Sequence, residues 1–290
     1  MEIRVLKYFT ETAKHKSMTK AAKTLHVTQP TLSRQLKDLE EELGQKLFTR
    51  SNYHIHLTPE GELLYKRAMD ILDIVDKTTT EFQSMNEFNG GDIHIGCAES
   101  YGIIIIAKTL KTLKERYSNI KFHLYSGNFQ TVSEKLNHGL LDVAITVQNI
   151  DTSNYNFLDL PYTDTWGILM RKDSPLANQT EMKISDILSL PLIISRQGFS
   201  DEMPNELKNM QSKMNVIGTY DLIYNASLFV QQGLGYALCL NHLVDTSSES
   251  DLCFIPITPI IVSPMKIIWP NNQLLSQTTE LFLSELKNNL

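Results

Sequence analysis

The sequence predicts an α/β protein that begins with a small helical head, continues into one long helix and ends in a larger α/β body. Three observations support this prediction. Apolar residues recur at helical spacing through residues 1–43, and they recur at alternating steps of four and three residues from Leu64 to Met85. From residue 92 onward, short β-branched runs alternate with helical segments, which is the pattern of repeated β-α-β units around a mainly parallel sheet.

The length and composition indicate a soluble protein of more than one domain. A chain of 290 residues is too long for one ordinary core, and its 42% apolar and 21% charged residues are typical of globular proteins. No run of apolar residues is long enough for a membrane span, and the N-terminus has no uninterrupted apolar segment, so neither a membrane partner nor a secretory signal is predicted. The three cysteines are widely spaced, which indicates a cytoplasmic protein with no disulfide framework and no metal site.

The formal net charge of −6 is unevenly distributed along the chain. Residues 1–58 carry 10 Lys and Arg against 6 Asp and Glu, a net charge of +4, whereas residues 59–290 carry a net charge of −10. A basic head suits a polyanion such as DNA, because neutralising phosphates supplies much of the non-specific affinity. An excess of this size also arises by chance, so the charge alone decides little.

The first two helices of the head are marked by apolar spacing and a cap. Leu6 and Phe9 lie on one face of the first predicted helix. Ser17 is a suitable N-cap for the second. In that second helix Ala21 and Ala22 are small enough to let another helix approach closely.

The third helix follows after a short break and completes a helix-turn-helix. Thr28 is a suitable N-cap, and Pro30 lies in the first turn, where its missing N–H is harmless. Gly44 is positioned to end the helix. Two helices joined by a turn of about three residues make this motif. Its inner face consists of Leu32, Leu36, Leu39 and Leu43.

Polar side chains gather on the outer face of the first turn and a half of this third helix. A recognition helix contacts bases through its N-terminal residues, and arginine and glutamine read guanine and adenine edges respectively. We therefore predict DNA contacts here, while the alternative, an ordinary three-helix bundle with a polar face, stays open. The predicted contact residues are Gln29, Pro30, Thr31, Ser33 and Arg34.

A short hairpin is predicted after Gly44. The segment "LFTRSNYHIHLT" alternates in hydropathy and has Ser51-Asn52 as its turn. It has the character of a wing, and we expect Arg50 to reach the DNA backbone.

The long helix opens with Thr58 as cap and Pro59 in its first position. Its apolar residues form a heptad seam of about three heptads, which needs a partner. A second copy of the chain is the preferred partner, because two recognition helices would then read two half-sites. Packing of the seam against the chain's own body is the alternative. The predicted dimerisation residues are Leu64, Ala68, Ile71, Val75 and Phe82.

The body is predicted as two successive sets of strands and helices. The predicted strands are residues 92–98, 120–127, 141–147, 191–195, 215–220, 236–240 and 264–270. The predicted helices are residues 103–116, 130–137, 183–190, 203–212, 221–232 and 274–288, with Asp221 as the cap of the 221–232 helix.

Polar residues follow several of these strands, and ligands of open α/β sheets bind outside the carboxyl ends of strands. Glu99 and Ser100 also open a helix, whose N-terminal N–H groups favour an anion, and Arg196 adds a positive charge. We therefore predict a small-molecule site, with an anion or carboxylate as ligand, although Arg196 is as well explained by a surface ion pair. The predicted site residues are Ser100, Tyr101, Asn128, Thr146, Ser195 and Arg196.

Enzymatic and redox functions are poorly supported. The chain has no G-x-S-x-G elbow, no H-E-x-x-H motif and no phosphate-binding loop, so no catalytic residue and no cofactor is predicted. Gly233 and Gly235 lie after a helix and before a strand, the wrong order for a dinucleotide loop. A thiol switch stays open as an alternative, although Cys97 and Cys239 lie in apolar strand patterns and are expected to be buried.

The N-terminal 60 residues resemble the winged helix-turn-helix of LysR-type transcriptional regulators. The matching features are the Ala-Ala pair at 21–22, "TQPTLSRQLKDLE" at 28–40, the LG-x-x-LF-x-R pattern at 43–50 and "LTPEG" at 57–61. The resemblance implies that Gln29, Pro30, Ser33 and Arg34 lie at the major groove and that Arg50 contacts phosphate or the minor groove. It also implies a transcriptional regulator that is controlled by a small-molecule effector and assembles as a homodimer or homotetramer.

The remaining 200 residues are similar to the effector-binding domain of that family in pattern more than in motif. The resemblance implies a periplasmic-binding-protein-like domain of two α/β subdomains, with the chain crossing between them near residues 160–162 and 262–265. The implied domains are 1–58 (winged helix-turn-helix), 59–88 (linker helix) and 89–290 (effector-binding), the last divided into subdomain I, 92–160 and 266–290, and subdomain II, 162–264.

Overall fold

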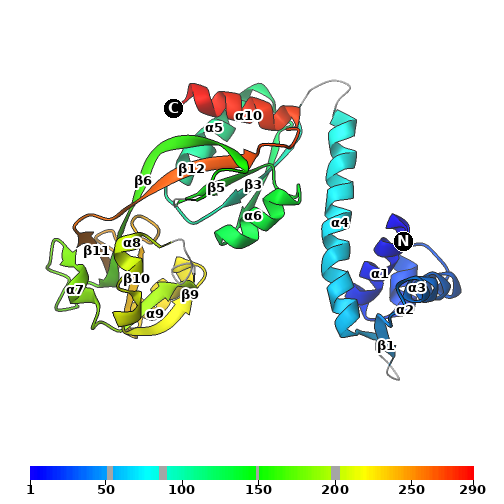
Figure 1. The fold of residues 1–290 in the computed structure, drawn as a ribbon, viewed down its shortest axis with the longest axis horizontal. Coiled ribbons are helices and arrows are strands. Elements are labelled where there is room, and N and C mark those ends of the chain that lie inside the picture. The colour runs from blue at the N-terminus through cyan, green and yellow to red at the C-terminus, as the bar shows by residue number, and fades with distance from the viewer. Residues whose placement is uncertain (51–54, 85–89, 148–149, 197–202) are drawn as a thin grey trace. The chain divides into compact units, whose positions relative to one another are not determined.

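A computed structural model describes residues 1–50, 55–84, 90–147, 150–196 and 203–290. It divides into two compact units, Met1–Gln83 and Ser84–Leu290, which are described separately below (Figure 1). The first is helical with a small hairpin and the second is α/β, so the predicted class is confirmed.

The first unit contains the predicted helix-turn-helix and hairpin. Its elements are α1 (Ile3–His15), α2 (Met18–Thr24), α3 (Gln29–Leu43), β1 (Phe48–Arg50), β2 (Ile55–Leu57) and α4 (Pro59–Ser84). The predicted hairpin turn at Ser51-Asn52 lies outside the described residues, but β1 and β2 pair antiparallel, with Phe48 opposite Leu57.

The caps that the sequence predicts in the head are present. The hydroxyl of Ser17 accepts a hydrogen bond from Lys20 N, and that of Thr28 accepts one from Thr31 N at 3.3 Å. Gly44 ends α3 with φ of +67°, a left-handed conformation that glycine adopts without steric cost. Local side-chain chemistry therefore sets where these helices begin and end.

One apolar core holds the head together and includes part of α4. Phe9, Ala21 and Leu32 are fully buried in it. The absence of bulk at Ala21 lets α2 lie close to α3. Ala68 and Leu72 of α4 are buried in the same cluster, so the start of the long helix belongs to the head.

The second unit is built around one mixed sheet. The strand order is β4-β3-β5-β12-β6-β10-β8-β9, with β11 also paired to β6 and β7 paired to β11. The strands are β3 (Asp92–Cys97), β4 (Lys121–Ser126), β5 (Val143–Thr146), β6 (Tyr155–Arg171), β7 (Met182–Lys183), β8 (Leu192–Ser195), β9 (Val216–Tyr220), β10 (Tyr236–Leu240), β11 (Leu252–Thr258) and β12 (Val262–Pro270). The helices are α5 (Ile103–Arg116), α6 (Phe129–Asn137), α7 (Ile184–Ile187), α8 (Asn205–Lys208), α9 (Ile223–Gln231) and α10 (Gln277–Asn288), with a 3-10 turn at Gln211–Lys213.

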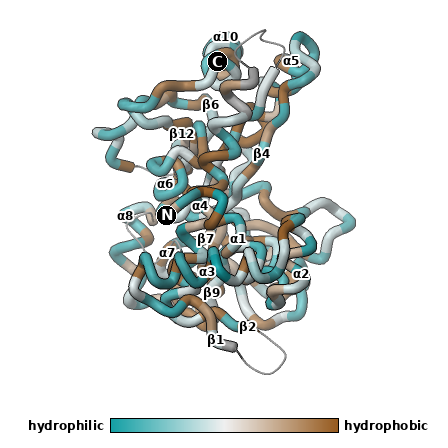
Figure 2. Tube along the Cα trace, turned by 90° about the vertical axis from the view of Figure 1, so that its right-hand side faces the viewer, coloured by the Kyte–Doolittle hydropathy of each residue, from teal (hydrophilic) through white to brown (hydrophobic). Residues whose placement is uncertain are grey.

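Strands β6 and β12 join two lobes of this unit. They run antiparallel and side by side between the lobes, and hydrophobic stretches lie along both (Figures 1 and 2). Lobe I comprises β3–β5, α5, α6 and α10, and lobe II comprises β7–β11 and α7–α9. The register of the pair shifts between Pro264 and Met265, opposite residues 160–163, which is where the sequence predicted the chain to cross.

Four details of the second unit differ from the prediction. Residues 155–171 form one continuous strand, and β11 was not predicted, because neither segment shows a simple alternation of apolar and polar residues. The predicted helix over 203–212 is only a short α8 followed by a 3-10 turn. Asp221 is not the cap of α9: the N-cap position is Leu222, without a side-chain cap of its own.

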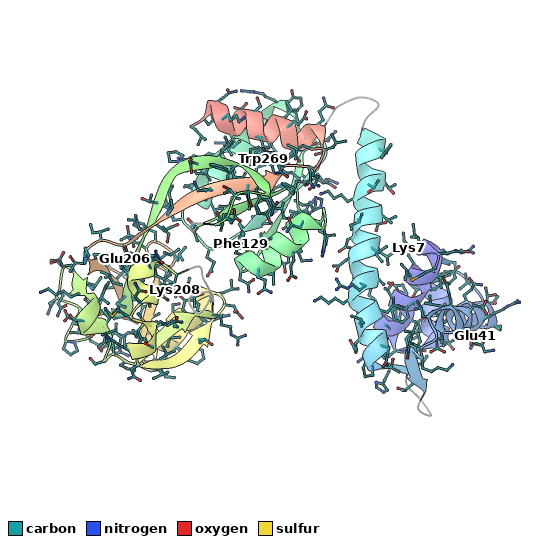
Figure 3. The ribbon with its side chains drawn as sticks, in the orientation of Figure 1. Lys7, Glu41, Phe129, Glu206, Lys208 and Trp269 are labelled. Carbon is teal, nitrogen blue, oxygen red and sulfur yellow. The ribbon has the colours of Figure 1, made fainter. Side chains whose placement is uncertain are left out.

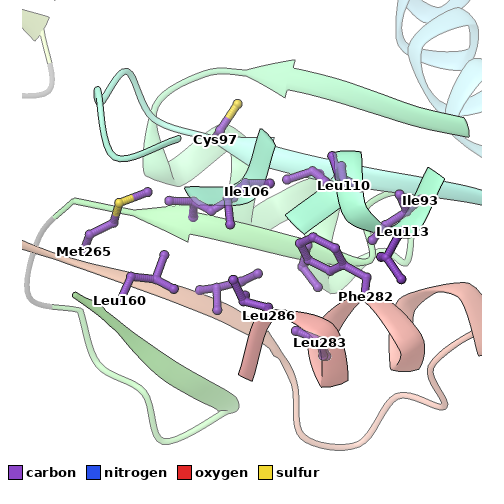
Figure 4. Packing of buried hydrophobic residues seen from close by; sticks show 14 of the residues in the cluster. Ile93, Cys97, Ile106, Leu110, Leu113, Leu160, Met265, Phe282, Leu283 and Leu286 are labelled. Atoms are coloured by element: carbon purple, nitrogen blue, oxygen red, sulfur yellow. The ribbon is translucent and has the colours of Figure 1, made fainter. Parts of the chain in front are cut away.

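Each lobe has its own apolar core. In lobe I, Phe282, Leu283 and Leu286 of α10 pack against α5 and the sheet (Figure 4). In lobe II, the buried residues of β6, β8 and β10 form the centre of the other cluster. The two lobes thus have distinct apolar clusters that meet beside the ribbon, where Leu240 of β10 packs into the cluster of lobe I and Trp166 packs against both clusters.

Candidate functional site

The first candidate site is the exposed start of α3. Gln29, Pro30, Thr31 and Arg34 are exposed there, and Ser33 is half-buried. The opposite face of α3 is anchored by its buried leucines. The structure thus brings the five predicted residues to one polar surface. Arg50 is the last residue of β1.

Glu40 links α3 to the hairpin, a role that the sequence did not reveal. Its carboxylate accepts hydrogen bonds from Leu47 N at 2.8 Å and Phe48 N at 3.2 Å, and it pairs with Lys46. Burial opposes the charge of Glu40, but the hydrogen bonds from Lys46 and the two amides outweigh it and lower the pKa of the carboxyl. The contact fixes β1 relative to α3.

Replacing Glu40 by alanine is expected to loosen the hairpin. The amides of Leu47 and Phe48 lose their acceptor, which costs about 1–3 kcal/mol for a buried donor. Hydrogen exchange of these two amides, measured by NMR, should accelerate between roughly fivefold and 150-fold. The control is Glu41→Ala, which removes an exposed carboxylate that pairs with Lys37 across one turn. Equal acceleration in both variants would contradict the role of Glu40.

The predicted dimer seam on α4 divides into two parts. Leu64 and Ile71 pack against the head core, and Ala68 is 0% exposed. Further along, Val75 is half-buried, and Phe82 is 67% exposed. The first half of the seam therefore packs on the head itself, which is neither the second chain nor the α/β body that the sequence suggested as partners, and the second half remains at the surface of this unit.

The second candidate site is a cleft between the two lobes of the second unit. Lobe I contributes the residues that follow β3, β4 and β5, as expected for a site at the carboxyl ends of strands. The lining residues are Ala98, Glu99, Gly127 and Val147 from lobe I, and Trp166, Ser195, Met203, Tyr220, Asp221, Leu222, Ile223, Cys239, Leu240 and Leu243 from β6 and lobe II.

Glu99 closes one side of this cleft by contacting the opposite lobe. Its carboxylate accepts a hydrogen bond from Ile223 N at 2.9 Å, at the start of α9. Glu99 thereby supplies the cap that Asp221 was expected to supply. Burial raises the pKa of the Glu99 carboxyl, and the hydrogen bond from Ile223 only partly offsets this.

A smaller hollow extends the cleft under lobe I. It shares Ala98, Gly127 and Val147 with the cleft and reaches Thr146 and Phe129. Phe129 lies at the start of α6 (Figure 3). Thr146 Oγ1 is buried and has no hydrogen-bond partner among the described residues, which is unusual for a buried hydroxyl.

The predicted pair Ser195 and Arg196 is only partly at the cleft. Ser195 lines it. The Arg196 guanidinium lies 3.8 Å from the Asp221 carboxylate, and both side chains are largely exposed. Arg196 therefore forms the surface ion pair that the sequence allowed as its alternative role.

Ser100 belongs to a buried network beside the ribbon. Its hydroxyl donates a hydrogen bond to Asp164 Oδ2 at 2.7 Å and accepts one from Gly102 N. The other oxygen of Asp164 is buried and has no partner among the described residues. Burial raises the pKa of Asp164 to about 6, against the opposing effects of the Ser100 hydrogen bond and of His242.

Two further predicted residues have other roles. Tyr101 is half exposed and its ring contacts those of Tyr162 and His242. The Asn128 carboxamide accepts a hydrogen bond from Thr131 N at 2.8 Å and so caps α6. The described linings of the cleft and of the smaller hollow do not include Ser100, Tyr101 or Asn128. The cap at Asn128 was readable from the sequence as an Asn before a helix.

Two of the three cysteines have the buried character that the sequence predicted for them, and Cys253 is half-buried. Cys97 and Cys239 are buried, and burial raises the pKa of Cys239 to about 12. Burial also raises the pKa of Cys253. Thiols with raised pKa values are poor nucleophiles at neutral pH, which argues against a redox switch.

The residues that the structure describes are 1–50, 55–84, 90–147, 150–196 and 203–290. These ranges contain no group of three or more His, Cys, Asp or Glu side chains that could hold a metal ion. None of the helices in the same ranges is long and apolar enough to cross a membrane.

Comparison with protein families matches both units. Residues 3–62 match the model of the bacterial regulatory helix-turn-helix protein of the lysR family, and residues 86–290 match the LysR substrate binding domain. The regulator BsdA of Bacillus subtilis is 29% identical over 98% of this chain and 99% of its own. The regulator YwbI of the same organism is 28% identical over 100% of this chain and 97% of its own.

Solved structures show the same fold at low sequence identity. CbnR in complex with its target DNA matches all of this chain and all of its own, with a TM-score of 0.78 and 18% identity. Full-length BenM covers 99% of this chain and 96% of its own, with a TM-score of 0.53 and 22% identity. Because the substrate-binding family model alone spans more than half of the sequence, the chain belongs to the LysR family of DNA-binding transcriptional regulators, with a helix-turn-helix followed by an effector-binding domain.

Proposed function

We propose that this regulator recognises a two-fold symmetric operator through α3, and that a small molecule bound in the cleft between its lobes changes its affinity for DNA. The observation that carries the proposal is the exposed polar start of α3, whose opposite face is packed into the core of the head. The cleft supplies the second half of the proposal, because residues of two lobes with distinct apolar clusters line it.

The proposed contacts follow from the chemistry of the exposed residues. Arg34 donates to a guanine edge and Gln29 forms paired hydrogen bonds with adenine. Thr31 and Ser33 contact base edges or phosphate, and Pro30 keeps the first turn free of an unpaired N–H. Arg50, at the end of β1, contacts phosphate or the minor groove.

The proposed dimer uses the part of α4 that the head does not cover. Val75 and Phe82 continue the heptad seam beyond the head core, and an exposed phenylalanine at such a position suits a second copy of the same helix. Leu64, Ala68 and Ile71 support the dimer indirectly by fixing α4 on the head.

The proposed domains are residues 1–58, 59–88 and 89–290. The proposed subdomains of the last domain are 92–160 plus 266–290 and 162–264.

A second self-association surface would make a tetramer possible. Lobe I has an apolar hollow between α5 and β4, which includes Phe122 and Leu124. Lobe II exposes Tyr224, Leu228 and Phe229 on α9. Exposed apolar groups on both lobes suit contacts between effector-binding domains of different chains.

A regulatory role explains the cleft better than an enzymatic one. The Ser100 hydroxyl donates its proton to the Asp164 carboxylate and not to an imidazole, so it lacks the arrangement of an activated nucleophile. Since the chain acts on DNA, we place it in the cytoplasm. The ligand would act by binding one relative arrangement of the lobes more tightly than another.

The proposal is tested by selecting binding sites for the full-length protein from random double-stranded DNA. We expect the selected sequences to contain two inverted half-sites, because a symmetric dimer presents two copies of α3. Sequences without two-fold symmetry would contradict the dimer, and the absence of any enriched sequence would contradict specific recognition.

A further inference from the structure

We propose that the effector carries a protonated amine on an apolar body, and that Glu99 is the specificity-determining residue that binds this amine and rejects carboxylates. The inference rests on the proposed function, since it names the class of ligand for the same cleft. It replaces the anionic ligand that the sequence predicted.

The first step concerns the helix end at which an anion would bind. The N-terminal N–H groups of α9 face the cleft, and Ile223 N already donates to the Glu99 carboxylate at 2.9 Å. The favourable interaction between this helix end and a negative charge is therefore used by the protein's own side chain. An anionic ligand would have to displace Glu99 or lie against it.

The second step concerns the charge of the lining. The described lining contains two carboxylates, Glu99 and Asp221, and no Lys, Arg or His. Arg196 stands beside Asp221 and pairs with it at the rim. A ligand carboxylate would be repelled by these two carboxylates. An ammonium group would pair with Glu99, whose carboxylate is already partly desolvated.

The third step concerns the capacity of Glu99. One hydrogen bond to Ile223 N leaves further acceptor sites on a carboxylate, which has two oxygens and about four lone pairs. Burial without a cation raises the pKa of this carboxyl. A cation within about 4–6 Å reverses that effect and favours the charged form, so binding of an amine relieves the cost of burying Glu99.

The fourth step concerns the rest of the cleft, which suits an apolar body. Trp166, Leu240 and Leu243 line it on the lobe II side. The adjoining hollow contains Phe129, Val132 and the hydroxyl of Thr146, which is 2% exposed and unpartnered among the described residues. A buried hydroxyl without a partner in this hollow is an independent sign of a ligand, because such groups are normally satisfied.

The test measures how tightly the full-length protein binds probes that share an apolar body and differ in charge. The probes are pairs of small arylalkyl compounds that share the same apolar body and end in either a primary amine or a carboxylate. Binding is followed by saturation-transfer NMR and by isothermal titration. We expect wild-type protein to bind amines at least tenfold more tightly than the paired carboxylates.

A matched substitution assigns the preference to Glu99. In Glu99→Gln the side chain still has an oxygen that can accept from Ile223 N, so the link between the lobes is retained while the charge is removed. We expect amine affinity to fall at least tenfold and the preference over carboxylates to disappear. Thr146→Val should weaken binding of both probe types, and Asp221→Asn should change the preference less than Glu99→Gln does.

The outcomes separate this inference from the proposed function. Carboxylates that bind wild type as well as amines do would overturn the amine assignment and leave the cleft as the effector site. Amines that bind Glu99→Gln as tightly as wild type would overturn the role of Glu99. If no probe of either charge binds, the amine assignment is overturned, whereas operator recognition through α3 is decided separately by the selection of binding sites from random DNA. The wild-type comparison alone decides the ligand class even if Glu99→Gln does not fold.

Discussion

A protein in which both Gln29 and Arg34 are replaced by alanine is expected to lose most of its affinity for the selected operator. Each side chain is proposed to make a paired contact with one base, and such a contact contributes about 1–3 kcal/mol of discrimination. Removing both should weaken specific binding by about 2–6 kcal/mol, which is roughly 30-fold to 20,000-fold in the dissociation constant. Because both residues are exposed, the head should remain folded.

The measurement is fluorescence anisotropy with the selected operator and with unrelated DNA at one fixed salt concentration. Loss of Arg34 removes a positive charge and should weaken binding to both, but only the operator should lose the large specific component. The control is Lys14→Ala, which removes one positive charge from α1, where Lys14 pairs with Glu11. An operator affinity reduced no more by the double substitution than by Lys14→Ala would rule out α3 as the reading helix.

The second large effect is expected in the pH dependence of the effector-binding domain. The pKa of Asp164 is raised from 3.8 to about 6 by burial, so the folded state holds this proton more tightly than the unfolded state does. The free energy of unfolding should therefore fall as pH rises from about 4 to about 6, and the loss should be complete above that range. Its size is up to about 3 kcal/mol, from 1.36 kcal/mol for each unit of pKa.

Asp164→Asn should remove this dependence. The asparagine oxygen can still accept from Ser100, and the side chain cannot ionise. Its amide nitrogen takes the position of an oxygen that has no partner among the described residues, so the net gain at pH 7.5 should be smaller than the full effect of about 3 kcal/mol. The difference in stability between variant and wild type should nevertheless increase in favour of the variant from pH 4 to pH 7.

Both tryptophans, Trp166 and Trp269, lie in the second unit, so urea unfolding followed by tryptophan fluorescence reports on this domain within the full chain. The control is Glu181→Gln, which removes an exposed carboxylate from the same unit. If the free energies of unfolding of Asp164→Asn and wild type differ by the same amount at every pH, the raised pKa of Asp164 is contradicted.

The features of the fold that the sequence predicted well are those encoded by near neighbours. Ser17, Thr28 and Gly44 act within a few residues of their own positions, so their roles as caps can be read locally. The sequence did not predict strand β6. The strand runs from lobe I to lobe II, so the surroundings of its side chains change along its length, and its buried and exposed residues do not alternate regularly.

The site was harder to predict because its partners are distant along the chain. Glu99 accepts from a backbone amide 124 residues away, and Ser100 donates to a carboxylate 64 residues away. The prediction chose loops at the carboxyl ends of the strands, and of its six residues Ser195 lines the cleft and Thr146 lines the adjoining hollow. It could not tell which side chain of "CAESYG" turns toward the opposite lobe and which turns into the interior.

The two-stranded ribbon of β6 and β12 limits how the lobes can move. Its strands stay hydrogen-bonded to one another, with Asp164 opposite Ser263, right up to the irregular step beside Pro264. A paired ribbon resists stretching and sliding, because either would break several ladder hydrogen bonds, but it twists at small cost about its own length. Ligand binding should therefore produce mainly a torsion of one lobe against the other, with the length of the connection unchanged. The response of this domain to its ligand is then a rotation of one lobe about the ribbon. For a given rotation, an atom of that lobe is displaced in proportion to its distance from the axis of rotation.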